Sequence, residues 1–190
     1  LRVSPTVVSQ RGGAVVQFVG ANFLNSPDIL CRFDTVDAST EVVYNASTLS
    51  CIAPSHAVGD VTVTLSFSGQ DVSESSTVIT YVANPVVDRI SPVFGPLSGE
   101  TVVQLYGQNM HPEMVCRFGD VVVKATFYSA EHVSCATPTQ LSAGSQPLAT
   151  SVNGVQFVQS GLVFTFLPKA TVSYILPRSG PETGGSKVFL

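Results

Sequence analysis

The chain repeats itself, and this repetition constrains the fold more than any other feature of its 190 residues. Three segments begin with a proline that is followed seven residues later by a glycine, at Pro5 and Gly12, Pro92 and Gly99, and Pro177 and Gly184. The three prolines are spaced by 87 and 85 residues. A fixed period indicates one structural unit used several times. We therefore expect two complete copies, residues 1–83 and 84–168, and the first part of a third, residues 169–190.

Each copy reads as a series of short strands. Stretches rich in Val, Thr, Phe and Ile alternate apolar with polar residues, and none has the 3.6-residue period of a helix. In the first long stretch of each copy, the residues predicted to face inward are Val16 and Phe18, Val103 and Leu105, and Val188 and Leu190. A later stretch of the first copy alternates in the same way. The residues predicted to share one face of this strand are Val61, Val63, Leu65 and Phe67. Short strands separated by frequent turns predict an all-β chain of sandwiches.

Turn-forming residues recur between these stretches. Asn153-Gly154 predicts a two-residue hairpin turn, because both central positions of that turn favour positive φ, and Ser68-Gly69 occupies the matching place. Gly99 is expected to turn the chain into the first long strand. Gly107 and Asn109 are expected to end that strand, since both residue types tolerate left-handed backbone.

The second copy, with "SPVFGPLSGETVVQLYGQNM" at 91–110 followed by "VCRFGD" and "VSCATPT", resembles an IPT/TIG domain. This is the immunoglobulin-like module found in plexins, transcription factors and many cell-surface proteins. The first copy departs from the pattern because it lacks the Gly-Pro after "SP" and has "RFD" for "RFG". The resemblance implies that the chain folds into tandem immunoglobulin-like β-sandwiches, which are of the IPT/TIG type and similar to E-set domains. Short proline-containing linkers at 83–86 and 167–170 predict that these sandwiches are arranged end to end.

Each complete copy contains one pair of cysteines, separated by 20 residues in the first and 19 in the second. Four cysteines allow three connectivities. Because each repeat should close in the same way, we expect the disulfides Cys31–Cys51 and Cys116–Cys135. The alternative is two buried free thiols in each copy. Arg32 and Arg117 follow the first cysteine of each pair, and strand alternation places them on the outer face.

A glycosylation sequon occurs once, as Asn45-Ala46-Ser47. The matching place in the second copy is Ser129, so the sequon lies in a turn that varies between copies and could carry a glycan. We therefore identify Asn45 as a candidate glycosylation site.

Residues arranged for catalysis are not recognisable in the sequence. The three histidines, His56, His111 and His132, occupy unrelated positions in the copies, and neither a nucleophile motif nor a recurring acidic pair is present. The segment 180–187 has Ser before Lys, the reverse of a phosphate-binding loop. We accordingly expect neither an enzyme nor a cofactor or metal site.

The sequence leaves several non-catalytic functions open. Paired cysteines, the sequon and a charged fraction of 12% favour an extracellular or cell-surface array, such as a stalk, a receptor ectodomain or a fibre, that binds proteins or further copies of itself. A first alternative is a DNA-binding or dimerisation domain of an intracellular transcription factor. A net charge of −4 and nine scattered Lys and Arg residues argue against nucleic acid.

A second alternative is an accessory carbohydrate-binding module of a secreted enzyme. The chain has no Trp, and its five Tyr residues are spread along the sequence, so we expect no aromatic platform. An apolar run long enough to cross a membrane is also missing from this segment, and direct membrane insertion is therefore not expected.

Overall fold

The computed structural model of the chain is built from strands, and it describes residues 1–23, 29–67, 70–71, 73, 75–140 and 142–189. The strands of the first copy are β1 (Arg2–Ser4), β2 (Val7–Ser9), β3 (Val15–Val19), β4 (Ile29–Phe33), β5 (Val36–Asn45), β6 (Thr48–Ile52), β7 (Gly59–Phe67), β8 (Gln70–Asp71) and β9 (Thr77–Val82). Those of the second are β10 (Val86–Ser91), β11 (Phe94–Pro96), β12 (Val102–Gln108), β13 (Val115–Phe118), β14 (Val121–Ser129), β15 (His132–Ala136), β16 (Gly144–Ser151) and β17 (Val158–Leu167). No described segment forms a helix that could span a membrane.

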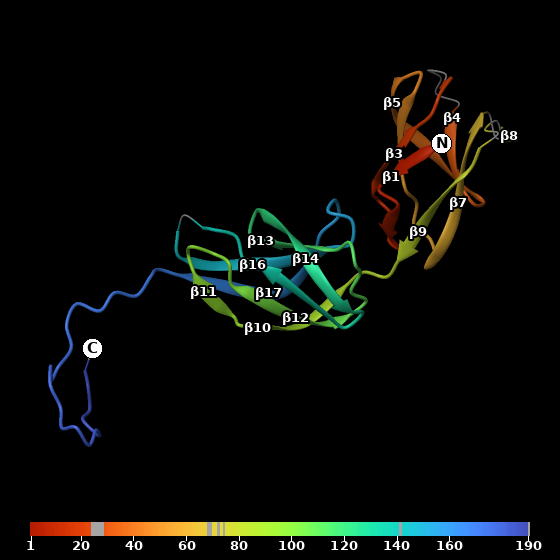
Figure 1. Ribbon diagram of the computed structural model, residues 1–190. Coiled ribbons are helices and arrows are strands. Elements are labelled where there is room, and N and C mark those ends of the chain that lie inside the picture. Colours follow the sequence, from red (N-terminus) through yellow and green to blue (C-terminus); the bar gives the residue numbers. More distant parts are fainter. Residues whose placement is uncertain (24–28, 68–69, 72, 74, 141, 190) are drawn as a thin grey trace.

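The two copies have the same strand order. It runs β1-β3-β6-β5-β4-β7-β9-β2 in the first and β10-β12-β15-β14-β13-β16-β17-β11 in the second, and β8 is an added strand beside β7. The long strands β5 and β14 pair with a neighbour in each of the two layers, β4 and β6 or β13 and β15. Each copy is therefore one sandwich, as the alternation of residues predicts, and it is of the immunoglobulin-like type that the IPT/TIG resemblance implies (Figure 1).

The core of each sandwich consists of the residues predicted to face inward. Val16 and Phe18 of the first copy and Val103 and Leu105 of the second are fully buried. Val61, Val63 and Leu65 are also buried, whereas the side chain of Phe67 lies outside what the structure describes. Because strand side chains alternate between faces, this pattern confirms the register inferred from the sequence.

The beginning of each copy forms edge strands in both layers. In the second copy β10 pairs antiparallel with β12, and after Pro92 the chain crosses to the other layer, where β11 pairs parallel with β17. Gly99 then forms the predicted turn, with φ of 76° and its N–H donating to the Pro96 carbonyl at 3.1 Å. A Cβ at this position would lie 2.6 Å from the carbonyl carbon of Pro138.

The end of the first long strand differs in part from the expectation. Asn109 has the predicted left-handed backbone, with φ of 58°. Gly107 does not, because it still belongs to β12 and its φ is not positive. A Cβ on Gly107 would overlap the Val86 carbonyl oxygen. The close approach of β10, rather than backbone handedness, therefore requires glycine here.

The predicted tight hairpin at Asn153-Gly154 is wrong. A six-residue loop, 152–157, separates β16 from β17, and of these two residues only Gly154 has positive φ. The Asn153 side-chain oxygen accepts hydrogen bonds from the backbone N–H groups of Val155 and Gln156, at 3.0 and 3.3 Å, and these bonds hold a wider loop. The matching Ser68-Gly69 lies outside the described residues.

Residues 168–189 extend away from the second sandwich (Figure 1). Their pairing is a single bridge in which Leu176 and Phe189 exchange backbone hydrogen bonds of 3.0 and 2.8 Å. Val188, expected to face a core, is 53% exposed, because this segment has no second layer to cover it. Leu190 lies outside the described residues.

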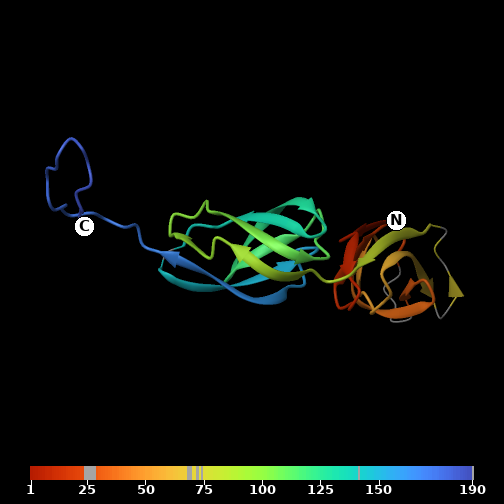
Figure 2. The ribbon, with the colours of Figure 1, turned by 90° about the horizontal axis from the view of Figure 1, so that it is seen from below.

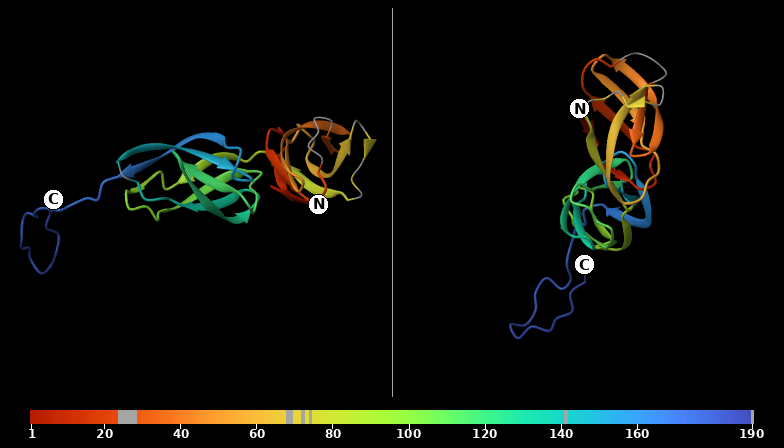
Figure 3. Two further views of the ribbon diagram at one scale, coloured as in Figure 1. Left: turned by 90° about the horizontal axis from the view of Figure 1, so that it is seen from above. Right: turned by 90° about the vertical axis from the view of Figure 1, so that its right-hand side faces the viewer.

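The two sandwiches lie end to end, and the connection between them is bent. Figure 1 shows the strands of the first sandwich running across the direction of those in the second. Figure 2 looks nearly along the first sandwich while the second is seen from its side, and the views in Figure 3 agree. The segment between the last strand of one and the first of the next is only residues 83–85.

Candidate interaction surfaces

Each sandwich contains one buried disulfide. The sulfur atoms of Cys31 and Cys51 are 1.98 Å apart, and those of Cys116 and Cys135 are 2.00 Å apart. The first disulfide links β4 to β6, and the second links β13 to β15, so each ties one layer of a sandwich to the other.

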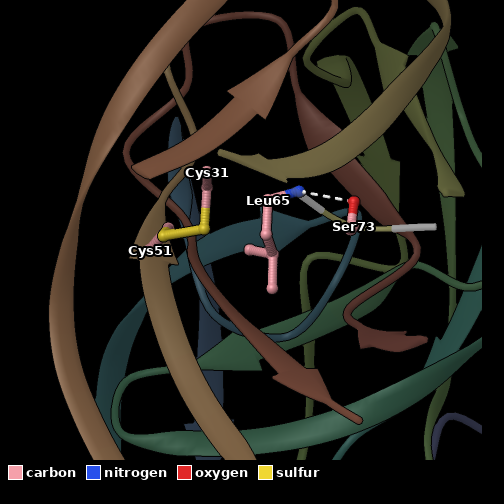
Figure 4. The surroundings of a disulfide bond; sticks show 4 residues. All are labelled: Cys31, Cys51, Leu65 and Ser73. Carbon is pink, nitrogen blue, oxygen red and sulfur yellow. Dashed lines mark hydrogen bonds between the residues drawn. A yellow bond between two sulfur atoms is a disulfide. The ribbon is translucent and has the colours of Figure 1, made fainter. Parts of the chain in front are cut away.

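The first disulfide lies within the apolar core of its sandwich. The buried Leu65 lies beside the disulfide, and its backbone N–H donates to the Ser73 hydroxyl at 3.1 Å (Figure 4). The four cysteines are thus structural parts of the two cores, and the described chain has no free thiol.

The arginines that follow the first cysteines contact their own sandwich. Arg32 Nε donates to Asp37 Oδ1 at 2.8 Å, directly across the β4–β5 pair. This hydrogen bond from the guanidinium lowers the pKa of the Asp37 carboxyl. Arg117 instead places its guanidinium 4.2 Å from the centre of the Phe157 ring, a cation–π contact that fixes the end of the loop 152–157.

That loop also reaches the other sandwich. The Asn153 side-chain amide donates to the Val7 carbonyl at 3.3 Å, and the Gln156 side-chain amide donates to the Gly12 carbonyl. Val7, whose carbonyl accepts one of these bonds, is buried although it belongs to neither core cluster. The loop therefore forms a joint in which side chains of the second sandwich bind backbone groups of the first. Sequence analysis assigned Asn153 only to a turn and missed this role.

An ordered row of rings crosses the outer face of the second sandwich. The Arg89 guanidinium lies 3.8 Å from the centre of the Tyr106 ring. His132 stacks on Tyr106 with ring centres 4.5 Å apart, and Tyr128 stacks on His132 at 4.7 Å. These residues, on β10, β12, β15 and β14, are called the ring row below. Sequence analysis did not foresee this cluster, because strand pairing brings together residues that are far apart in the sequence.

The geometry of the ring row limits what it can bind. Because β12 lies between β10 and β15, Arg89 and His132 cover opposite faces of Tyr106. His132 is covered in the same way by the two tyrosines, and its Nε2 is 2.8 Å from the Gln104 side-chain oxygen. The faces of Tyr106 and His132 are therefore covered by their neighbours, and Tyr128, 55% exposed, is the most accessible tyrosine of the row.

The sequon asparagine lies on an exposed turn. Asn45 is the last residue of β5, and the two-residue turn 46–47 connects it to β6. Its side-chain oxygen accepts hydrogen bonds from the Ser47 N–H at 2.8 Å and the Ser47 hydroxyl at 2.7 Å. All three sequon residues are exposed, so a glycan here would extend into solvent.

The three histidines lie in separate environments. The His56 ring packs 5.1 Å from Tyr81, His111 Nδ1 accepts from the Glu113 N–H at 3.3 Å, and His132 belongs to the ring row. Within the described ranges, no group of three His, Cys, Asp or Glu side chains is placed to hold a metal ion.

Comparison with known proteins identifies the repeated unit. The family model of the IPT/TIG domain matches residues 1–81 and, separately, residues 85–166. Plexin-A3 of Mus musculus is 24% identical over 201 residues, covering 98% of this chain and 11% of plexin-A3. Fibrocystin-L of Mus musculus is 30% identical over 102 residues, covering 52% of this chain and 2% of fibrocystin-L.

A solved structure of the plexin A4 extracellular region has the same fold. It superposes with a TM-score of 0.57 at 21% identity, covering 93% of this chain and 16% of that one. The chain spans about a tenth of the length of the plexin relatives that it matches. The two family matches together cover most of the chain, and each contains one complete sandwich. This chain therefore belongs to the IPT/TIG domain family.

Proposed function

We propose that this chain is a non-catalytic part of an extracellular or cell-surface array that acts through contacts with other proteins. The observation that carries the proposal is the joint, where the loop 152–157 of one sandwich is hydrogen-bonded to the backbone of the other. Such a joint holds two modules in a defined relative orientation, which suits a spacer that presents surfaces at set positions.

Two features support an extracellular location. Disulfides persist in oxidising compartments, and each sandwich has one in its core. Similarity to plexin-A3, and a fold shared with the plexin A4 extracellular region, favour a receptor ectodomain over a fibre. The glycan proposed at Asn45 fits the same location, because the three sequon residues are exposed.

The ring row is the surface best suited to a protein partner. Tyrosine and arginine are enriched where proteins bind one another, since they combine apolar area with hydrogen bonding. Sugar recognition is less well supported, because the faces of Tyr106 and His132 are covered by their neighbours. Nucleic-acid binding is also less favoured, since Arg32, Arg89 and Arg117 contact other side chains rather than forming one basic stripe.

We also propose that residues 169–190 begin a third repeat, with units bounded at 1–83 and 84–168. The turn at Gly184 supports this assignment. Its φ is 78°, and its N–H donates to the Pro181 carbonyl at 2.9 Å. The corresponding values at Gly99 are 76° and 3.1 Å, and at Gly12 they are 68° and 2.9 Å.

A surface-labelling experiment tests the location. Intact source cells are treated with a membrane-impermeant biotin reagent, and a cytosolic protein serves as the control for leakage. We expect this protein to be labelled before the cells are permeabilised. Labelling only after permeabilisation would contradict the proposal. Binding to duplex DNA in a filter assay at low salt, abolished by added salt, would support the transcription-factor alternative instead.

A further inference from the structure

The joint uses a part of the first sandwich that has a close counterpart in the second. In the first, Val7 pairs with Thr80 of the last strand, and in the second, Phe94 pairs with Thr165. The neighbouring backbone bonds also correspond, since Gln10 N–H donates to Val82 and Leu97 N–H donates to Leu167. The two carbonyls that the joint uses, those of Val7 and Gly12, therefore correspond to the carbonyls of Phe94 and Gly99.

The two counterparts differ sharply in exposure. Val7 is 9% exposed although it belongs to neither core cluster, and its carbonyl accepts the hydrogen bond from Asn153. Phe94, at the same place in the second sandwich, is 57% exposed. Beside it Val93 is 51% exposed, and Leu167, which pairs with Pro96, is 43% exposed. An apolar patch thus surrounds Phe94, whose counterpart Val7 is buried at the joint, whereas Thr6, the counterpart of Val93, is exposed and Val82, the counterpart of Leu167, is half-buried.

We propose that this patch, Val93, Phe94 and Leu167 with the carbonyls of Phe94 and Gly99, is the seat for the next sandwich of the same chain. The occupant is the third repeat's counterpart of the loop 152–157. In the first joint that loop supplies two side-chain amides that donate to backbone carbonyls, and the residue before Asn153, Val152, is buried. The same chemistry fits the exposed Phe94 and the two carbonyls.

The connecting segments are of equal length, so the third sandwich can follow the second with the geometry by which the second follows the first. Pro92 follows the end of β9 by ten residues, and Pro177 follows the end of β17 by ten residues. A third sandwich that begins at the same distance from the second would place its loop at the equivalent position. This inference rests on the proposed array, because it requires that residues 169–190 begin a third repeat.

Hydroxyl-radical footprinting tests the seat. The full chain with every repeat that follows residue 168 is compared with the same chain ended at residue 168, and oxidation is measured at Phe94. We expect oxidation of Phe94 to fall severalfold when the third repeat is present. Oxidation of Tyr128, which is 55% exposed on the opposite layer, should be unchanged and serves as the internal control.

A variant gives a second readout. Phe94→Asp places a charge in the seat. We expect it to weaken the contact between the second and third sandwiches, and so to broaden the distribution of distances that X-ray scattering of the full chain reports. Val102→Asp, at a valine 51% exposed on β12, is the matched control and should leave the profile unchanged. A third sandwich that unfolds cooperatively while Phe94 stays fully oxidisable would overturn the seat and leave the array intact. The lack of any folded third sandwich would overturn both.

Discussion

The side-chain amide of Gln156 donates a hydrogen bond to the backbone carbonyl of Gly12, 144 residues earlier in the chain. The acceptor is a backbone atom, so its position depends on the turn at Gly12 rather than on a side-chain rotamer. The donor is positioned by a loop whose end, Phe157, packs against Arg117 of its own sandwich. The joint is therefore built from two locally ordered parts, and this explains how a short linker can hold a bent arrangement.

Two glycines with positive φ allow the stability cost of left-handed backbone to be separated from the cost of a steric clash. Gly99 and Gly161 have nearly the same φ, 76° and 77°. A Cβ on Gly99 would meet the backbone at Pro138, whereas a Cβ on Gly161 would meet nothing within 4 Å. We expect Gly161→Ala to lower the free energy of unfolding by about 1–2 kcal/mol, the cost of left-handed backbone.

Gly99→Ala should cost at least twice as much, because it adds a steric clash with backbone that cannot move away. Urea unfolding of both variants measures the difference. Equal losses of stability would show that the approach to Pro138 is unimportant and that handedness alone selects glycine.

Both disulfides should stabilise their sandwiches. Each closes a loop of about 20 residues, so replacing Cys31 and Cys51 together by Ala should lower the free energy of unfolding by about 3 kcal/mol. Replacing Cys116 and Cys135 together by Ala should lower the free energy of unfolding by a similar amount. Peptide mapping without reduction should recover Cys31 joined to Cys51. A peptide that joins Cys51 to Cys116 would contradict both the pairing and the proposed boundaries.

Asn45 should carry a glycan when the protein is secreted by a eukaryotic cell. Treatment with a glycosidase should then lower the mass of the wild-type protein, and Asn45→Gln should remove this shift. Asn109→Gln serves as a control, because Asn109 is followed by Met110 and His111 and lies in no sequon. An unchanged mass for treated wild-type protein from such a cell would refute the site.

Tyr81 should make the first sandwich sensitive to alkaline pH. Burial raises the pKa of Tyr81 from 10.0 to about 12, so the folded state keeps the phenol proton where the unfolded chain loses it. The resulting stability is complete below pH 10 and is lost as the pH rises from 10 toward 12. Tyr81→Phe should remove this loss.

At neutral pH Tyr81→Phe should cost about 1 kcal/mol, because the hydroxyl no longer donates to the Pro54 carbonyl at 3.0 Å. Unfolding midpoints in urea between pH 8 and pH 11 provide the measurement. Tyr174→Phe, outside both sandwiches, is the control. A wild-type curve that stays parallel to the Tyr81→Phe curve across this range would contradict the assignment.

The features that the sequence predicts well are those that repeat or alternate locally. The inward positions of Val16, Phe18, Val103 and Leu105 follow from the two-residue period of a strand. The repeated unit follows from the spacing of the repeated segments, and its immunoglobulin-like fold is what the resemblance to the IPT/TIG domain implies. Both features arise from patterns within one copy. The sequence contains each pattern more than once, so one copy can be checked against the other.

The features that the sequence did not predict depend on contacts between distant segments. The ring row needs Arg89, Tyr106, His132 and Tyr128 to be adjacent across four strands, and no local pattern marks that register. The hairpin at 153–154 failed because the Asn153 side chain bonds within a wider loop and to the other sandwich. Propensity for a tight turn was overridden by these contacts.

Small-angle X-ray scattering of the 190-residue chain tests the central claim, that the two sandwiches are held end to end by the loop 152–157. The wild-type profile should match the bent arrangement of Figure 1. Replacing Asn153 and Gln156 together by Ala should broaden the distribution of distances between the sandwiches, while Val155→Ala, at an exposed residue of the same loop, should not. A compact profile with the sandwiches packed side by side, or a double variant indistinguishable from wild type, would contradict the account.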